Sequence, residues 1–252
     1  MALPFKVEPY VIKHSAAVHI SSGITRFQRA TWNVLLHNAY RELPTKERHA
    51  IRTDDLLSRL GVHTRNLEFV KETLRALVQT SVEWNVLGKD KDARWGVAAL
   101  LAEAELRDGI ITYAYGPTLR GRLHSPKMFA RVVLSLQQAF ATQYGLPLYE
   151  LVVDYSWGDG HAETPWIELA KLRELLGSGD SYPTWSAFRQ KALDRAVADV
   201  NDNSDFRVAY ETQKQGRAVA AVKVKGYRFD PEATPEAAAP TLPFDHIQGE
   251  RS

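Results

Sequence analysis

Apolar side chains recur at helical spacing in the first third of the chain and then alternate with polar ones. Thr25 is a candidate N-cap. After it, one face of a helix is formed by residues four apart: Phe27, Thr31, Leu35 and Ala39. Similar patterns predict three helices in all, at about 25–39, 54–60 and 64–79. Strict alternation then predicts strands joined by a charged turn, at 82–86 and 95–101. Two more strands are expected at 110–115 and 131–134, with the basic segment TLRGRLHSPK between them.

The second half repeats this order of elements. Short helices are predicted at 135–144, 148–155 and 168–176, with Pro147 at a first helical turn, where its missing N–H is tolerated. A longer helix follows, and its buried stripe is expected at Phe188, Ala192, Leu193, Ala196 and Val200. Two alternating strands, 206–213 and 218–229, form a hairpin with a basic, glycine-containing turn. Three helices followed by a hairpin are the pattern of a winged helix.

The chain is therefore assigned to the α+β class, as two tandem winged-helix domains with a disordered C-terminal tail. We expect an N-terminal arm at 1–23, a first domain at 24–134 and a second at 135–229. The segment 230–252 is rich in Pro, Ala and Glu and cannot build a core, so it is expected to be disordered.

Composition limits the kinds of bond the protein can form and the cellular compartment in which it is expected. The 252 residues include no cysteine, which excludes disulfides and thiolate metal sites. No apolar run approaches the roughly 20 residues that span a bilayer, and no signal-peptide pattern is present. We expect a soluble cytoplasmic protein with no membrane partner.

Charge is unevenly distributed along the chain, although the net charge is only +2. Residues 1–130 carry 19 basic and 13 acidic side chains, and 184–228 carry 9 and 5. Residues 131–183 and the tail after Arg228 are acidic on balance. Two separate positive regions are consistent with two surfaces that face phosphate, although such fluctuation also occurs by chance.

The helix after Tyr182 is the strongest candidate for base recognition. In a helix-turn-helix domain the third helix enters the major groove and its N-terminal residues face base edges. The apolar stripe faces the core, so Ser186, Arg189 and Gln190 point away from it. Arginine can contact guanine O6 and N7 together, and glutamine can do the same for adenine. The residues expected to meet phosphates flank this face: Thr184, Lys191 and Arg195.

The turn QKQGR adds a basic wing to this helix. Lys214 and Arg217 are placed at the tip of the hairpin, where a wing reaches the minor groove or the backbone. A solvated amphipathic helix with ordinary surface charges is the alternative interpretation. Helix and basic wing together favour DNA binding over that alternative.

Catalytic and metal-binding patterns are not found. The eight histidines form neither an H-x-H pair nor an HExxH motif, and no GxxxxGK phosphate loop occurs. We therefore expect no catalytic residues, no metal and no cofactor.

An ordered set of motifs resembles a known family. YGLPLYELVVDY, LRELLG and YPTWSAFRQKALDRAVADVNDNSDF, followed by the QKQGR turn, resemble the C-terminal winged helix of iteron-binding plasmid replication initiators of the RepA/RepE type. VHISSGITRFQRATWNVLLHNAYREL is similar to the start of that family's first winged helix. The family's pattern is matched by Phe188, Lys191, Leu193, Asp194, Ala196 and Asn201, with Arg189 in place of the usual Lys and Asp199 in place of Glu.

The resemblance implies a non-enzymatic initiator that binds repeated origin sequences as a monomer. It also implies an inactive or autorepressing homodimer formed through the first domain, which adds accessory DNA contacts. Arg189, Lys191 and Arg217 occupy positions that the family uses for DNA. The expected partners of such an initiator are double-stranded origin and promoter DNA, a host initiator and a helicase. It is expected in a bacterial cell, associated with plasmid or nucleoid DNA.

Two questions stay open at this point. A winged-helix transcriptional repressor without a role in initiation would use the same chemistry as an initiator. In the tail, the apolar segment TLPFD is a speculative docking motif for a sliding clamp, although its occurrence by chance is the simpler explanation.

Overall fold

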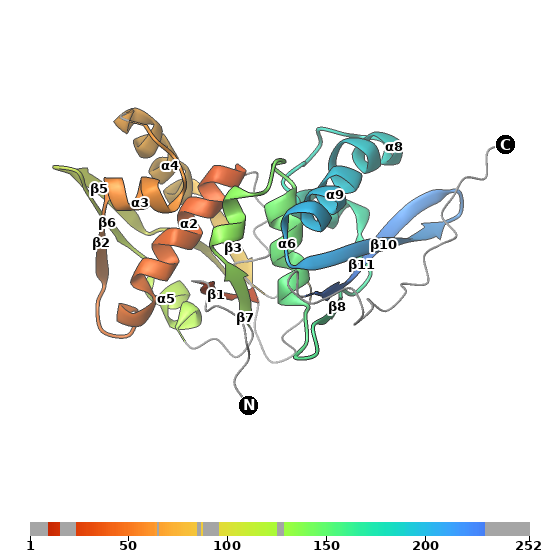
Figure 1. The fold of residues 1–252 in the computed structure, drawn as a ribbon, viewed down its shortest axis with the longest axis horizontal. Helices are drawn as coiled ribbons and strands as arrows, with labels where there is room; N and C mark the ends of the chain where they lie inside the picture. The colour runs from red at the N-terminus through yellow and green to blue at the C-terminus, as the bar shows by residue number, and fades with distance from the viewer. Residues whose placement is uncertain are drawn as a thin grey trace.

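The computed structural model describes residues 10–15, 24–64, 66–84, 87, 96–124 and 129–229 of the chain. Two units lie side by side (Figure 1), and in each of them helices precede a β-hairpin. The predicted α+β arrangement of two winged helices is confirmed. The tail 230–252, with its TLPFD segment, lies outside the described residues, so the expectation of disorder stays a prediction.

The first unit contains helices α2 (Arg26–Ala39), α3 (Thr53–Arg59), α4 (Leu67–Gln79) and α5 (Pro117–Leu123). Its strands are β1 (Tyr10–His14), β2 (Arg48–Arg52), β3 (Ser81–Trp84), β4 (Gly96–Ala99), β5 (Glu103–Arg107), β6 (Ile110–Ala114) and β7 (Phe129–Val133). In the described ranges these strands form three antiparallel sheets, with the orders β1-β7, β2-β6-β5 and β3-β4.

The second unit contains helices α6 (Gly145–Asp154), α7 (Leu169–Leu175), α8 (Trp185–Phe188) and α9 (Asp194–Asn203). Its strands are β8 (His161–Glu163), β9 (Ile167–Glu168), β10 (Phe206–Gln215) and β11 (Ala218–Arg228). They form one antiparallel sheet of order β10-β11-β8, in which β9 also pairs with β11.

Local sequence accounts for the start of α2. Thr25 Oγ1 accepts a hydrogen bond from Gln28 N at 3.2 Å, and Gln28 Oε1 accepts one from Thr25 N at 2.9 Å. This reciprocal capping box satisfies two backbone donors that the helix itself leaves unpaired. The N-cap predicted at Thr25 is confirmed.

Several elements differ from the sequence-based expectation. No element was predicted for β2, β8 or β9, and the helix predicted at 135–144 is only a 3₁₀-helical turn at Ser135–Gln138. Strand β1 lies within the predicted N-terminal arm, and pairs Tyr10 with Val133 and His14 with Phe129 at its ends. Helix α5 lies in the basic segment for which no element was predicted, and Pro117 occupies its first turn. Strand β5 was not predicted either, although its sequence EAELR alternates; only Ala104 and Leu106 are apolar, and both are only partly buried.

Helix α6 lies between the two units (Figure 1) and contacts β7 on one side and α9 on the other. All ten of its residues are buried. Because α6 packs against both units, the domain boundary predicted between residues 134 and 135 stays a prediction.

A buried ionic cluster connects α6 to the first unit. Lys13 Nζ and Arg29 Nη1 each lie 2.7 Å from Glu150 Oε2, and Asn33 Nδ2 donates to Glu150 Oε1 at 2.7 Å. Burial lowers the pKa of Lys13 to about 8, against the attraction of Glu150. Burial alone would raise the pKa of Glu150, but the charges of Lys13 and Arg29 outweigh it and hold that pKa below its usual value. The carboxylate is therefore charged and neutralised by cations from β1 and α2.

A second buried carboxylate, Asp199 of α9, holds the loop that leads into α6. Its oxygens accept hydrogen bonds from the backbone N–H of Ala141 at 2.9 Å and of Thr142 at 2.7 Å, and from Thr142 Oγ1 at 2.7 Å. Gly145, the first residue of α6, packs directly against this carboxylate. A Cβ at this position would lie 2.8 Å from Asp199 Cγ and 2.9 Å from Phe140 Cδ1.

Gly145→Ala is therefore expected to lower the free energy of unfolding by about 2 kcal/mol, because an added methyl group overpacks a buried site. Gly121→Ala is the matched control, since a Cβ there meets open space on α5. That change should be neutral or slightly stabilising, because alanine favours helix over glycine. Urea denaturation of both variants measures the difference, and equal stabilities would show that the close approach at Gly145 is relieved at no cost.

Among the residues that the structure describes, no helix is both long enough and apolar enough to cross a bilayer.

Candidate nucleic-acid interface

The proposed recognition helix begins at Thr184, whose side chain accepts a hydrogen bond from Ala187 N at 3.2 Å. It runs through α8, a π-helical turn at Arg189–Leu193, and α9 as one continuous helix. The residues predicted to form its buried stripe are all fully buried: Phe188, Ala192, Leu193, Ala196 and Val200. The side of this helix that faces the core was therefore predicted correctly.

The π-helical turn explains how this stripe stays on one face. Apolar residues four apart drift by about 40° per step around an α-helix of 3.6 residues per turn. A π-helical turn contains one extra residue, and here Asp194 N bonds to Arg189 O five positions back. The extra residue cancels most of the drift, so Phe188 and Val200 reach the same core. Such turns often occur at functional sites.

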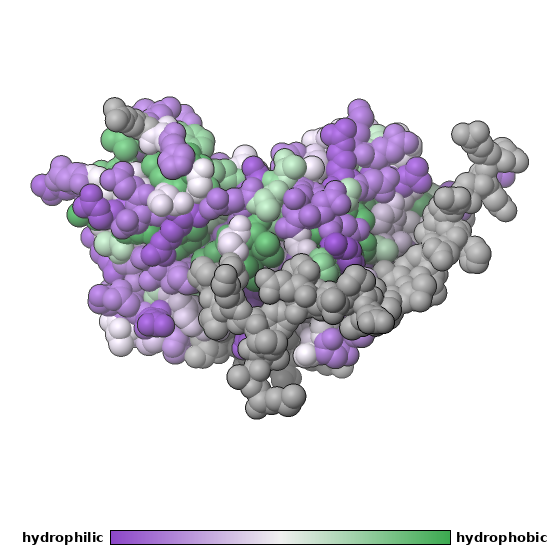
Figure 2. Space-filling model, in the orientation of Figure 1, coloured by the Kyte–Doolittle hydropathy of each residue, from purple (hydrophilic) through white to green (hydrophobic). Residues whose placement is uncertain are grey.

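The predicted base-reading residues lie on the opposite side of the same helix. Ser186, Arg189 and Gln190 are exposed. The flanking residues assigned to phosphates are exposed as well: Thr184, Lys191 and Arg195. Hydrophilic residues gather over α8 and α9 on the face shown in Figure 2. The structure thus presents all six side chains to solvent on one helix, and their contacts with DNA stay a prediction.

Strands β10 and β11 form the wing. Their ladder runs from the Phe206–Arg228 pair to Gln215–Ala218, with a register shift between Gln213 and Lys214. Gly216 has a φ of +63°, which favours glycine in the two-residue turn at the tip. The predicted wing contacts are both exposed: Arg217 is the second residue of this turn, and Lys214 lies near it on β10.

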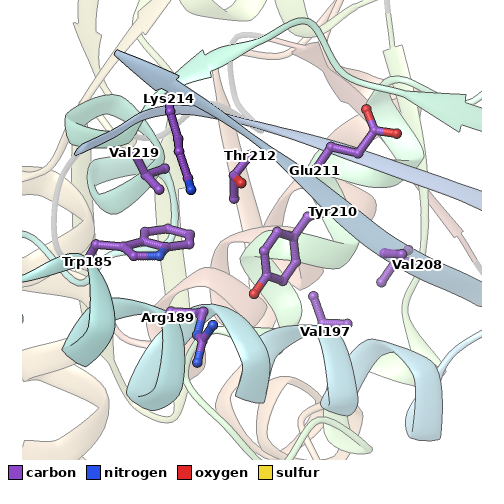
Figure 3. A pocket seen from close by; sticks show the side chains of 10 residues that line it. Trp185, Arg189, Val197, Val208, Tyr210, Glu211, Thr212, Lys214 and Val219 are labelled. Carbon is purple, nitrogen blue, oxygen red and sulfur yellow. The ribbon is translucent and has the colours of Figure 1, made fainter. Parts of the chain in front are cut away.

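An open groove of ≈ 500 Å³ separates the recognition helix from the wing (Figure 3). Trp185, Arg189 and Val197 line it from the helix, and β10 supplies the opposite wall with Val208, Tyr210, Thr212 and Lys214. The groove has an apolar floor and a basic residue on each wall. A DNA strand passing from the helix to the wing would cross it.

Several acidic residues of the second unit have partners within that unit. Asp199 is buried and bonded to the loop before α6. Asp205 Oδ2 lies 2.9 Å from Arg228 Nε, and Glu211 Oε1 accepts from Lys225 Nζ at 2.8 Å. Three of the five carboxylates between residues 184 and 228 thus bind other groups of the same unit, two of them as ion pairs.

The corresponding helix of the first unit, α4, is less strongly basic. Lys71 and Arg75 are exposed on it, but Lys71 Nζ pairs with Glu68 Oε1 at 2.6 Å and Glu72 is exposed on the same helix. This balance is consistent with the accessory role expected for the first domain.

Sequence patterns missed two residues of this interface. Asp194 and Tyr210 connect the recognition helix to β10, because Tyr210 Oη donates to Asp194 Oδ1 at 2.6 Å. The family motif marked Asp194 as a matching position but gave it no role. The described ranges contain no cluster of three or more His, Asp or Glu side chains arranged to hold a metal ion.

Two family models match the chain. One described as "Initiator Replication protein, WH1" matches residues 10–153, and one described as "Initiator Rep protein, WH2" matches residues 168–230. No curated protein sequence matches the chain.

Solved structures share the fold at low sequence identity. The crystal structure of "Pi initiator protein in complex with iteron DNA" is similar at a TM-score of 0.66 and 15% identity, over 90% of this chain and 100% of that one. A structure of domains 2 and 3 of RctB has a TM-score of 0.45 and 11% identity, over 90% of this chain and 94% of that one. At such identities the likeness to the Pi structure concerns the fold alone.

Proposed function

The chain belongs to the initiator Rep protein family, and from this membership we propose that it initiates plasmid DNA replication by binding repeated origin sequences, or iterons. The observation that carries this proposal is the exposed basic helix and basic wing of the second unit, in a chain whose two domains both match initiator models. The Pi structure, a protein of the same fold, was solved with iteron DNA.

We assign sequence recognition to the second domain. Its helix would enter the major groove with Arg189 at a guanine and Gln190 at an adenine, while Ser186 accepts or donates as the base requires. Lys214 and Arg217 would hold the backbone beside the neighbouring minor groove. The remaining phosphate contacts are assigned to the flanks of the helix, at Thr184, Lys191 and Arg195.

The first domain is assigned accessory DNA contacts and homodimer formation. In this proposal the monomer binds the origin, and the dimer binds the promoter of its own gene and represses it. Bound monomers help to open adjacent AT-rich DNA and recruit host replication proteins, among them an initiator and a helicase. No catalytic step is assigned to the chain.

A plasmid maintenance assay tests this function. A replicon without its own origin receives the DNA that flanks the gene, and the protein is supplied from a second plasmid. We expect the replicon to persist only when the wild-type chain is present. Sequence-specific binding of this DNA without maintenance would instead assign the chain to the winged-helix repressors. Nicking of the supercoiled DNA in Mg²⁺ would contradict the non-enzymatic assignment.

Lys214→Ala tests the wing. We expect weaker binding to all duplexes alike, with the slope of log K against log salt reduced by about 1, because one phosphate contact is lost. Lys46→Ala is the control, since this exposed lysine lies in the first unit and pairs with Glu42. A salt slope equal to that of the wild type in both variants would contradict the assignment of Lys214 to phosphate.

A further inference from the structure

A short chain of contacts connects β10 to Arg189, the main candidate for base reading. Asp194 Oδ1 accepts a hydrogen bond from Tyr210 Oη at 2.6 Å, and Asp194 Oδ2 lies 3.7 Å from Arg189 Nε. The side chains of Arg189 and Asp194 are each 45% exposed. Figure 3 shows the Tyr210 hydroxyl directed toward the helix at Arg189. The three side chains thus form a line from the wing to the DNA-facing side of the helix.

The π-helical turn makes this contact possible. In a regular α-helix, side chains three or four positions apart are neighbours, whereas residues five apart point in different directions. Arg189 and Asp194 are five apart, and the hydrogen bond from Asp194 N to Arg189 O closes the wider turn between them. The extra residue of the turn therefore brings a carboxylate beneath the guanidinium.

The geometry suits an arginine that reads a base. A carboxylate near Nε restrains the guanidinium from one edge and leaves both Nη groups free to fork onto guanine O6 and N7. Tyr210 in turn holds the carboxylate, and its ring packs edge-on against Trp185 with centroids 6.5 Å apart. Burial, followed by the bond to Asp194, raises the pKa of Tyr210, so its hydroxyl keeps the proton that it donates.

We propose that Asp194, held by Tyr210, is a positioning residue that orients Arg189 and so sets sequence specificity at one base pair. This inference rests on the proposed function, because it requires that Arg189 reads a base. An acidic group so close to DNA opposes binding to phosphate. Asp194 therefore weakens binding to any duplex while it strengthens discrimination between sequences.

These two effects separate a positioning role from a merely structural one. Asp194→Asn should bind random duplex DNA as tightly as the wild type or more tightly, because one negative charge is removed. Its preference for the cognate base should fall by about fivefold to tenfold, because the guanidinium loses its restraint. A variant that is only misfolded would lose both kinds of binding together.

The experiment uses the full chain and a pool of randomised DNA duplexes. The wild type selects a motif from this pool, and binding of each variant is then measured on that motif, on each single-base change in it and on random duplex. Asp194→Asn is compared with Asp202→Asn, which makes the same charge change at an exposed position on the same helix. Tyr210→Phe keeps the ring against Trp185 and removes only the hydroxyl. Thermal unfolding of each variant checks its fold.

We expect Asp194→Asn and Tyr210→Phe to lose discrimination at the same single base pair, and Asp202→Asn to keep it. In an Arg189→Ala background, Asp194→Asn should have no further effect on discrimination. Unchanged discrimination in Tyr210→Phe and Asp194→Asn would overturn the positioning role while leaving the proposed function intact. If the wild type selects no motif, the proposed function and this inference fail together.

Discussion

Glu150→Gln is expected to lower the free energy of unfolding by about 3–5 kcal/mol, the range found when one partner of a buried ion pair is removed. Lys13 and Arg29 both place a cation 2.7 Å from the same oxygen of Glu150. The glutamine would remove the negative charge that both buried cations contact. Because the three side chains come from β1, α2 and α6, the loss should loosen the contact between the units.

Urea denaturation measures this effect, with Glu103→Gln as the surface control. Glu103 pairs with Arg48 at 2.6 Å, but both side chains are about half exposed, and such pairs contribute roughly 0–1 kcal/mol. Lys13→Met is a second comparison and should be much milder than Glu150→Gln, because Arg29 and Asn33 still bind the carboxylate. A change of less than 1 kcal/mol in Glu150→Gln would contradict the role assigned to the cluster.

Arg189→Ala is expected to weaken binding to the cognate repeat by about 1–3 kcal/mol and to relax the sequence preference at one position. The reason is the loss of a bidentate contact that only guanine offers in this pattern. Binding to random duplex DNA should change far less. Equilibrium titrations of both duplexes at one salt concentration give the two affinities.

Arg195→Ala is the matched control for this change. It also removes an exposed arginine from the recognition helix, but at a position assigned to phosphate. We expect it to weaken both duplexes alike and to leave the sequence preference unchanged. If Arg189→Ala also weakens both duplexes equally, Arg189 contacts the backbone and not a base.

Local patterns in the sequence predicted the recognition helix and the wing of the second domain well, but not β8 or β9. The recognition helix has an apolar stripe at regular spacing, and β10 and β11 alternate in their buried parts, on either side of a glycine turn. The two-residue connection sets the register next to the turn, up to the shift between Gln213 and Lys214. The exposed side of the helix was also predicted correctly, because it is the side opposite the apolar stripe.

Features that depend on distant residues could not be predicted in this way. Lys13 is buried on β1 only because Glu150, 137 positions away, neutralises it. The π-helical turn depends on how the side chains of α9 pack against the core. The approach of Asp194 to Arg189 depends on the same packing. Strand β5 did carry a local signal in the sequence, because the Asp108-Gly109 dipeptide that follows it is typical of a two-residue hairpin turn. In the structure both residues have the positive φ that such a turn requires, 51° and 73°.

Footprinting of the protein on the DNA that flanks its own gene tests the central claim most directly. If the helix and wing of the second domain read iterons, the wild type will protect evenly spaced repeats in one orientation, and Arg189→Ala will lose that protection at the same concentration. Uniform protection of the whole fragment, or the same repeats protected by both proteins, would contradict the claim.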